Sequence, residues 1–396
     1  MKRALAWIAL TLLTLAGAIG VVGYVVAAFY VTDRSQYVTD YGAIAAFAAA
    51  GLVAGGLSLL ALAMRLPASV RFPNEWLALA LFGLMLCAGF ASVIFERYLL
   101  FTPLLAIIAA AALFAFIARL SLRWSPGRQT AARGFVLPGV WGMVGAPLTA
   151  VVAQVITAVM LVSGGVAGLY LADASLMDSI GEWITGATEL TDLSIIRMPT
   201  IAAGTLAMLG IVAPLTEEFA KFLGVYLVLR RRVTTRLGVF LAGASAGLGF
   251  AIVETLGYAL MAVDQWPQVM LIRAPVAFIH VAATTIVALG WYKQRQSGGY
   301  WLVGFFALSV LLHGAWNSLF VSMLIVAGDV TSADVIDPAT AFTALVLVSA
   351  MGAVLVGAVM WIVGNARRLG REAVSAGDVP GTTSVVSRTT AGASSY

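Results

Sequence analysis

The stretch Pro214-Leu215-Thr216-Glu217-Glu218-Phe219-Ala220-Lys221 places two adjacent carboxylates and an ammonium group inside an otherwise apolar run from Met198 to Leu229. That run is long enough to cross a bilayer and is followed by three arginines, so the two glutamates lie deep in the predicted span. One ionised side chain at the centre of a membrane helix costs roughly 2.5–3.5 kcal/mol on an insertion scale. Two such residues side by side therefore indicate a functional site.

The composition predicts an integral membrane protein. Of the 396 residues 61% are hydrophobic and only 10% are charged, and the mean hydropathy is +0.99. Most apolar runs exceed the ~18 residues that signal a spanning helix, and they lack the alternation of a barrel strand. We therefore expect an all-α fold, a polytopic transmembrane helical bundle. The net charge of +5 arises in loops predicted to face the cytoplasm and gives no indication of nucleic acid binding.

About ten spans can be drawn along the chain, and both termini are predicted to be cytoplasmic. With the N-terminus inside, every inner loop is basic, and most acidic residues fall in the outer loops. The protein is thus expected in the cell membrane as a multi-pass protein surrounded by lipid bilayer. The predicted spans are Ala4 to Tyr30, Tyr41 to Met64, Trp76 to Phe95, Tyr98 to Ile117, Val144 to Leu171, Met198 to Leu229, Leu237 to Val263, Met270 to Trp291, Tyr300 to Val326 and Ala339 to Val363.

Three parts of the chain differ in their polar residues. Residues 1–135 hold four predicted spans without a deep ionisable side chain, and we interpret them as an accessory four-helix module. Residues 136–363 contain the buried charges and form the predicted catalytic core. Residues 364–396 end in a segment rich in Ser, Thr and Gly, which predicts a disordered cytoplasmic tail.

Four predicted helices carry polar side chains at similar depth. Counting ~1.5 Å per residue from the cytoplasmic ends, Glu217 lies about 18 Å into its span. By the same count Glu254 lies about 25 Å in, and His280 and His313 lie about 17 and 20 Å in. The two histidines are the only ones in the chain. Unrelated polar substitutions would scatter in depth, so the agreement predicts one shared site.

Spacing within the helices supports a gathered site. His313 and Asn317 are four residues apart and share a helix face, as do Glu217 and Lys221. The seventh predicted span is rich in Gly, Ala and Ser between residues 243 and 249, which lets neighbouring backbones approach closely. Three carboxylates then face one lysine, so either protons or a metal ion must compensate the excess negative charge. The adjacent carboxyls are expected to titrate as a coupled unit, and one of them can act as a general base toward water.

These residues resemble the PrsW family of polytopic intramembrane proteases. The family has a Glu-Glu-x-x-Lys helix, a Phe-x-x-x-Glu helix, a lone His on the next helix and a His-x-x-x-Asn helix. The similarity covers roughly Met198 to Val326, and Thr255 stands where the family commonly has Asn. Related motifs occur in the CAAX-processing and bacteriocin-immunity membrane proteases. The matching positions are Glu217, Glu218, Lys221, Phe250, Glu254, His280, His313 and Asn317.

The resemblance implies hydrolysis of a peptide bond in or near a transmembrane segment of a membrane protein, such as a single-span regulatory protein. Glu217 or Glu218 would activate a water molecule, while the other glutamate holds the proton or orients the water. His313 and Asn317 would donate hydrogen bonds to the developing oxyanion. The remaining residues, His280 and Glu254, would orient the water or bind a metal.

Metal dependence is left open by the sequence, and metal-free glutamate chemistry is the favoured hypothesis. His280, His313 and one glutamate, Glu218 or Glu254, make a His₂Glu set of the kind that holds catalytic zinc. Against zinc, the histidines lie on separate helices without His-x-x-x-His spacing, and Lys221 already supplies positive charge. No cofactor is therefore favoured, with zinc as the alternative.

Two other function classes also fit a polar cluster in a membrane. A proton- or cation-coupled transporter lines a cavity with Glu, Lys and His, and a non-catalytic membrane scaffold can retain the same residues. We find no internal repeat that suggests an inverted-symmetry transporter, and the His-x-x-x-Asn pairing suits oxyanion binding better. Of the isolated polar residues, Gln154 and Ser309 are interpreted as interhelical hydrogen-bonding groups, and Arg273 as an anchor at the membrane interface.

Overall fold

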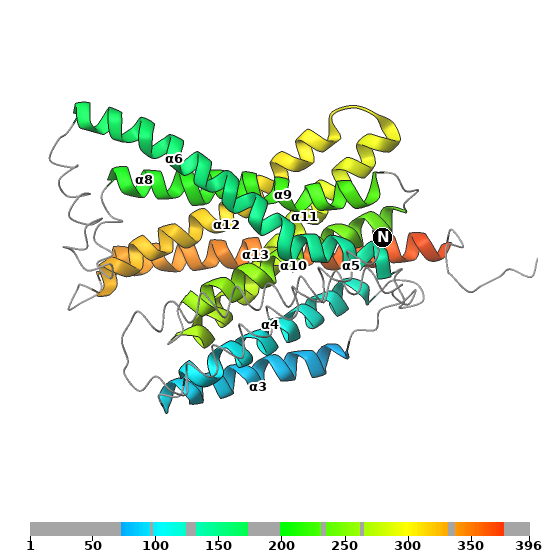
Figure 1. Cartoon of the computed structure of the whole chain (residues 1–396), viewed down its shortest axis with the longest axis horizontal. Helices are drawn as coiled ribbons and strands as arrows, with labels where there is room; N and C mark the ends of the chain where they lie inside the picture. The colour runs from blue at the N-terminus through cyan, green and yellow to red at the C-terminus, as the bar shows by residue number, and fades with distance from the viewer. Residues whose placement is uncertain are drawn as a thin grey trace, which may run out of the picture.

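The fold is entirely helical throughout the part of the chain that is described (Figure 1). The structure is a computed structural model, and it describes residues 73–95, 98–123, 132–172, 199–230, 235–261, 265–331 and 337–375. The predicted all-α class is confirmed there. The elements are α3 (Glu75–Ile94), α4 (Tyr98–Leu122), α5 (Ala132–Val140), η2 (Trp141–Gly145), α6 (Ala146–Ala172), α8 (Pro199–Ala207), η4 (Met208–Val212), α9 (Ala213–Leu229), α10 (Arg236–Met261), α11 (Trp266–Ser297), α12 (Trp301–Thr331) and α13 (Pro338–Ser375).

Six of the described helices are long and apolar enough to cross a membrane, which supports the multi-pass architecture. The first two predicted spans, Ala4 to Tyr30 and Tyr41 to Met64, lie outside the described residues. The count of ten spans and the cytoplasmic position of both termini stay predictions. The six segments are Glu75–Ile94, Leu137–Thr157, Arg236–Ala259, Trp266–Ser297, Trp301–Val326 and Pro338–Ser375.

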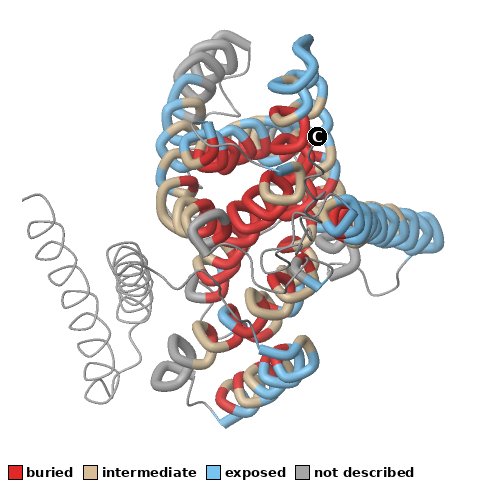
Figure 2. Tube along the Cα trace, turned by 90° about the vertical axis from the view of Figure 1, so that its right-hand side faces the viewer, coloured by how far each residue is buried: buried red, intermediate tan, exposed pale blue. Residues whose placement is uncertain are grey.

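Helix α10 is the most buried of the six and packs against α11 and the α5–η2 segment. The buried residues gather in the middle of the described bundle (Figure 2). Its small residues make this close packing possible. A Cβ atom added at Gly247 would lie 2.5 Å from the carbonyl oxygen of His280, and one at Gly249 would collide with the carbonyl of Gly139. Ser245 also donates a hydrogen bond to the Phe135 carbonyl at 2.5 Å. The predicted close approach of backbones along this helix is confirmed.

The span predicted from Met198 to Leu229 is one helix interrupted by a π-helical turn. Helix α8 leads into η4, where the N–H of Ala213 bonds to the carbonyl of Met208, five residues earlier. Pro214 then follows and has no N–H to offer to the next carbonyl. Short π-helical turns are rare and often mark functional sites.

Helix α13 is longer than the predicted last span. It begins after Asp337, whose carboxylate accepts hydrogen bonds from the N–H groups of Ala339 and Thr340 and from the Thr340 hydroxyl. These bonds hold the pKa of Asp337 below its ordinary value, and the bond from the Thr340 hydroxyl has the largest effect. The helix continues to Ser375, so the prediction of a disordered tail is wrong for residues 364–375. The reason is packing, since Ala366 and Leu369 are buried in the main core cluster.

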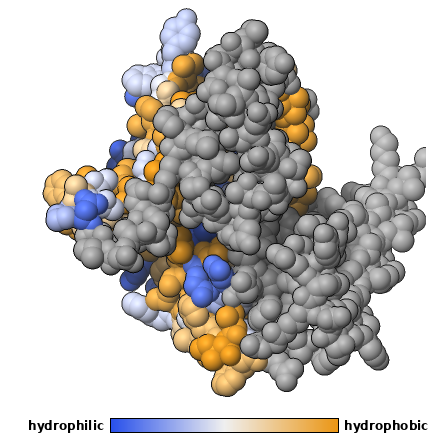
Figure 3. All heavy atoms as spheres, turned by 90° about the vertical axis from the view of Figure 1, so that its left-hand side faces the viewer, coloured by the Kyte–Doolittle hydropathy of each residue, from blue (hydrophilic) through white to orange (hydrophobic). Residues whose placement is uncertain are grey.

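The outer surface of the bundle is largely apolar, and much of the described surface in Figure 3 is hydrophobic. Helix α13 buries little of its length, as expected of a helix that faces lipid. Helices α3 and α4 pack together, and α4 also packs against α10. The division into an accessory module of residues 1–135 and a core of residues 136–363 stays a prediction.

Candidate active site

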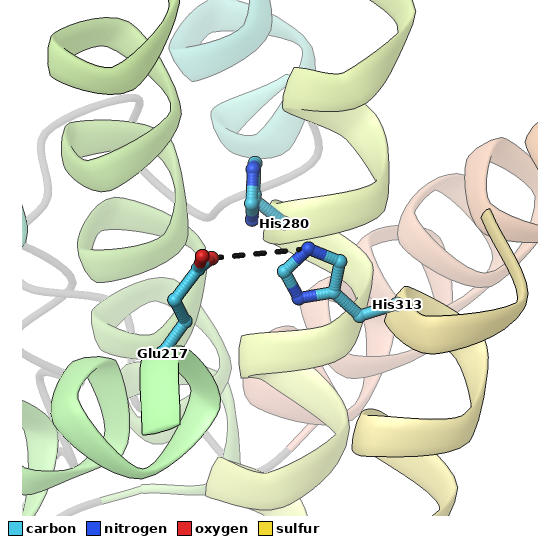
Figure 4. A group of neighbouring side chains, drawn as sticks. All are labelled: Glu217, His280 and His313. Carbon is cyan, nitrogen blue, oxygen red and sulfur yellow. Dashed lines mark ion pairs between the residues drawn. The ribbon is translucent and has the colours of Figure 1, made fainter. Parts of the chain in front are cut away.

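All seven predicted site residues come together inside the bundle. They project from four consecutive helices, α9 to α12, and the buried side chains of Glu217, His280 and His313 point toward one another (Figure 4). Trp141 of η2 fixes the position of α9 by donating a hydrogen bond to the Ala220 carbonyl at 2.8 Å. The seven residues are Glu217, Glu218 and Lys221 of α9, Glu254 of α10, His280 of α11, and His313 and Asn317 of α12.

Glu218 is fully buried and is surrounded by hydrogen-bond donors. Its Oε1 atom lies 2.6 Å from Lys221 Nζ and 2.9 Å from His313 Nδ1. Its Oε2 atom accepts from the hydroxyls of Thr284 at 3.1 Å and Ser309 at 3.3 Å. Four donors on two oxygens match the acceptor capacity of an ionised carboxylate, so Glu218 is held as an ion with its oxygens occupied.

Glu217 has a different environment. Its Oε1 atom accepts a hydrogen bond from Gln154 Nε2 at 3.2 Å. Its Oε2 atom lies 3.5 Å from Lys221 Nζ and 3.8 Å from His313 Nε2, the pair joined by the dashed line in Figure 4. Both distances are long for a hydrogen bond. The Oε2 atom therefore has free acceptor capacity, and it faces His313 Nε2.

His280 links two charged groups. Its Nδ1 atom lies 2.8 Å from Lys221 Nζ, and its Nε2 atom lies 2.8 Å from Glu254 Oε2. Because an ammonium group only donates, Nδ1 must accept and Nε2 must carry the proton that it donates to Glu254. Arg273 lies 2.7 Å from the same Glu254 oxygen. The interfacial position of Arg273 stays a prediction, but the residue also pairs with a site carboxylate, which the sequence analysis did not predict.

Asn317 connects the histidine of α12 to the π-helical turn. Its Nδ2 group donates to the carbonyl of Leu209 at 2.9 Å and lies 3.4 Å from His313 Nε2. The Leu209 carbonyl is available because the residue five positions later is Pro214, which has no N–H, while the N–H of Ala213 is bonded to Met208. One amide hydrogen of Asn317 thus completes the broken helix, and the other faces the site.

The charges of the cluster nearly balance once Arg273 is included. The three carboxylates are Glu217, Glu218 and Glu254, and the two cations are Lys221 and Arg273. One negative charge remains, and a single proton neutralises it. Since Glu218 has its oxygens occupied and Glu254 is paired with Arg273, Glu217 and the nearby Nε2 atom of His313 are the places for that proton.

The donor set also fits a divalent metal ion in type. Ligand atoms of Glu217, His280 and His313 all lie within 4.8 Å of one another, and His₂Glu is a donor set of catalytic zinc. The other ring nitrogen of each histidine bonds a carboxylate, Glu254 for His280 and Glu218 for His313, which is typical of metal-bound imidazole. Lys221 bonds His280 Nδ1 at 2.8 Å, so this nitrogen becomes a ligand only when the ammonium moves away. Glu218 and Glu254, predicted as metal candidates, lie outside this group.

Four residues that the sequence analysis did not assign to the site contact it. Thr284 lies four residues after His280, and Ser309 lies four residues before His313, so each shares a helix face with a site histidine. This spacing was the signal that could have found both. Arg273 lies seven residues, two helical turns, before His280 and therefore shares its face of α11, a weaker signal of the same kind. Gln154 lies on a helix without another site residue, and only the packing of α6 against the cluster identifies it.

A comparison with protein families agrees with this geometry. A family model described as PrsW family intramembrane metalloprotease matches residues 131–354, which is more than half of the chain. This range contains all seven site residues. The chain belongs to the PrsW family. Membership in the PrsW family makes it a membrane-embedded protease and confirms the resemblance seen in the sequence motifs. No curated protein and no solved structure matches the chain.

Proposed function

We propose that the protein is an intramembrane endopeptidase in which Glu217 activates the hydrolytic water. The observation that carries the proposal is the difference between the two adjacent glutamates. Glu218 has all its acceptor capacity in use, whereas Glu217 Oε2 lies 3.8 Å from His313 Nε2. A water molecule bonds to partners about 2.8 Å away, so one water placed beside the line that joins these two atoms can bond to both.

The hydrolytic step uses groups on α9 and α12. As the water oxygen bonds to the substrate carbonyl carbon, Glu217 Oε2 takes one water proton, and the carbonyl oxygen gains the negative charge. The carbon–nitrogen bond then breaks, and the proton on Glu217 passes to the leaving nitrogen. The products are a carboxyl and an amine, and Glu217 is an ion again.

His313 and Asn317 stabilise the oxyanion. The Nδ1–H of His313 is directed at Glu218, so the single compensating proton of the cluster can sit on Nε2, 3.8 Å from Glu217 Oε2. In that form Nε2–H is a donor next to the free amide hydrogen of Asn317. Two fixed donors in a site shielded from water are the arrangement that stabilises a tetrahedral intermediate.

A zinc-dependent version of the same protease is the second candidate, and the group formed by Glu217, His280 and His313 favours it. When bound there, zinc would supply a Lewis acid that polarises a carbonyl and lowers the pKa of bound water. We favour the metal-free form because Lys221 Nζ already bonds to Nδ1 of His280, the nitrogen that would bind the metal. Elemental analysis of active protein decides between the two. Stoichiometric zinc, whose removal by a chelator stops cleavage and whose return restores it, would overturn the metal-free form.

The proposed function is tested with purified protein in phosphatidylethanolamine–phosphatidylglycerol liposomes. The probe is a single-span peptide with a fluorophore and a quencher on either side of its membrane segment. We expect cleavage by the unchanged protein and by Glu372→Gln, a control far from the site whose carboxylate is half exposed. We expect none from His313→Ala. Equal cleavage by His313→Ala would contradict the assigned site, and a steady proton or cation flux without cleavage would favour a transporter.

A further inference from the structure

Two segments of the chain share a short sequence and a local structure. Ala146-Pro147-Leu148-Thr149 and Ala213-Pro214-Leu215-Thr216 are identical in sequence. Each follows a five-residue π-helical turn, η2 or η4, and each begins the helix that continues from it, α6 or α9. A four-residue identity is a weak sequence signal in a chain rich in alanine and leucine, so the repeat becomes evident only from the shared local structure.

The likeness extends to hydrogen bonds and register. The Thr149 hydroxyl donates to the Gly145 carbonyl at 2.7 Å, and the Thr216 hydroxyl donates to the Val212 carbonyl at 2.9 Å, each four residues back. Helices α6 and α9 pack together and run in opposite directions (Figure 1). They form an inverted pair of broken helices. Gln154 of α6 and Lys221 of α9 each lie eight residues after the alanine of the shared Ala-Pro-Leu-Thr segment, so Gln154 is the counterpart of Lys221.

Both counterparts face the same carboxylate. Gln154 Nε2 lies 3.2 Å from Glu217 Oε1, and Lys221 Nζ lies 3.5 Å from Glu217 Oε2. The second amide hydrogen of Gln154 goes to the Thr216 hydroxyl oxygen at 3.3 Å. That hydroxyl uses its own hydrogen on carbonyls of its helix, so its oxygen accepts. The amide orientation is thus determined, since the reverse would place the amide oxygen against the carboxylate.

We propose that Gln154 is a positioning residue of the hydrolytic site. By holding Oε1 of Glu217 against α6, its amide directs Oε2 toward His313 Nε2, where the proposed function places the water. The inference rests on that function, but the contact between Gln154 and Glu217 is open to a test without substrate. Gln154 has no role in our scheme other than this contact, so its loss is expected to lower kcat and to leave KM unchanged.

The test compares Gln154→Met with the unchanged protein. Methionine has a similar length and no hydrogen-bond donor, so packing against α9 is kept. The control is Thr157→Ala on the same helix, because the Thr157 hydroxyl bonds only the carbonyl of Ala153 among the contacts described for it. The first readout is the infrared carboxylate band of Glu217, identified as the band absent from Glu217→Gln. The second is kcat and KM on the single-span fluorogenic peptide.

We expect Gln154→Met to shift the Glu217 band and to lower kcat about tenfold, as for loss of one hydrogen bond to an ion, with KM unchanged. We expect Thr157→Ala to leave both readouts unchanged. An unmoved band, or a shifted band with an unchanged kcat, would overturn the positioning role. The two failures are distinguishable: full cleavage by Glu217→Gln would refute the proposed function, whereas an unmoved band in Gln154→Met refutes this inference alone.

Discussion

The adjacent glutamates Glu217 and Glu218 lie on two sides of helix α9 and have different hydrogen-bond surroundings. On the side that faces α11 and α12, Glu218 is bonded by Lys221, His313 and two hydroxyl groups, and it is completely buried. On the side that faces α6, Glu217 is bonded at one oxygen by Gln154 and keeps the other largely free. A carboxylate with every oxygen occupied organises its neighbours, and one with free acceptor capacity can take a proton from water. From this difference in surroundings we propose a structural role for Glu218 and a chemical role for Glu217.

The largest loss of activity is expected when Glu217, the glutamate with a largely free oxygen, is replaced. Replacing Glu217 by Gln removes the base but keeps the size of the side chain, so cleavage should fall about 10²–10⁴-fold, the usual range for general-base catalysis. Stability should change little, because Glu217 Oε2 makes only long contacts. Cleavage of the fluorogenic peptide and thermal unfolding in detergent check both parts. A large loss of stability in Glu217→Gln would contradict the proposed difference between Glu217 and Glu218.

Replacing Glu218, which is bonded on the side of α9 that faces α11 and α12, should lower the stability of the fold. Glu218→Gln leaves Lys221 buried beside a neutral amide, and removing one partner of a buried ion pair costs about 3–5 kcal/mol. We expect a markedly lower unfolding midpoint together with lost activity. Denaturation in mixed detergent micelles measures this, with Glu372→Gln at the half-exposed end of α13 as the matched control. Wild-type stability of Glu218→Gln would show that its four donors do not hold the bundle together.

A smaller loss of stability is expected when the hydroxyl groups that bond Glu218 Oε2 are removed. Thr284→Val keeps the shape of the side chain and removes the 3.1 Å hydrogen bond to Glu218 Oε2. A hydrogen bond to a charged group contributes about 1.5–3 kcal/mol, so the free energy of unfolding should fall by about that amount. Ser309→Ala, whose bond is 3.3 Å long, should cost less. The reverse order of the two variants would argue against the Glu218 arrangement described here.

The sequence predicted the residues of the site better than their roles. Rare charges at one depth and i, i+4 spacing predicted that these seven side chains lie together, as they do in the structure, because ionisable groups in a membrane helix are costly and helical geometry fixes which face they share. Their catalytic function stays a prediction. The roles of Glu217 and Glu218 could not be assigned, since Lys221 reaches both and the difference comes from residues on α6, α11 and α12. The π-helical turn also escaped prediction, because hydropathy reports how apolar a span is and not how its backbone bonds.

Chemical rescue tests the central claim most directly, because it asks which glutamate supplies the base. Glu217→Ala leaves a space beside His313 Nε2 that formate can enter, whereas Glu218→Ala removes a carboxylate bonded by four side chains. Cleavage of the fluorogenic peptide in liposomes is measured for both variants with increasing formate. We predict that formate restores cleavage by Glu217→Ala in a concentration-dependent way and has no effect on Glu218→Ala. Rescue of Glu218→Ala without rescue of Glu217→Ala would contradict the account.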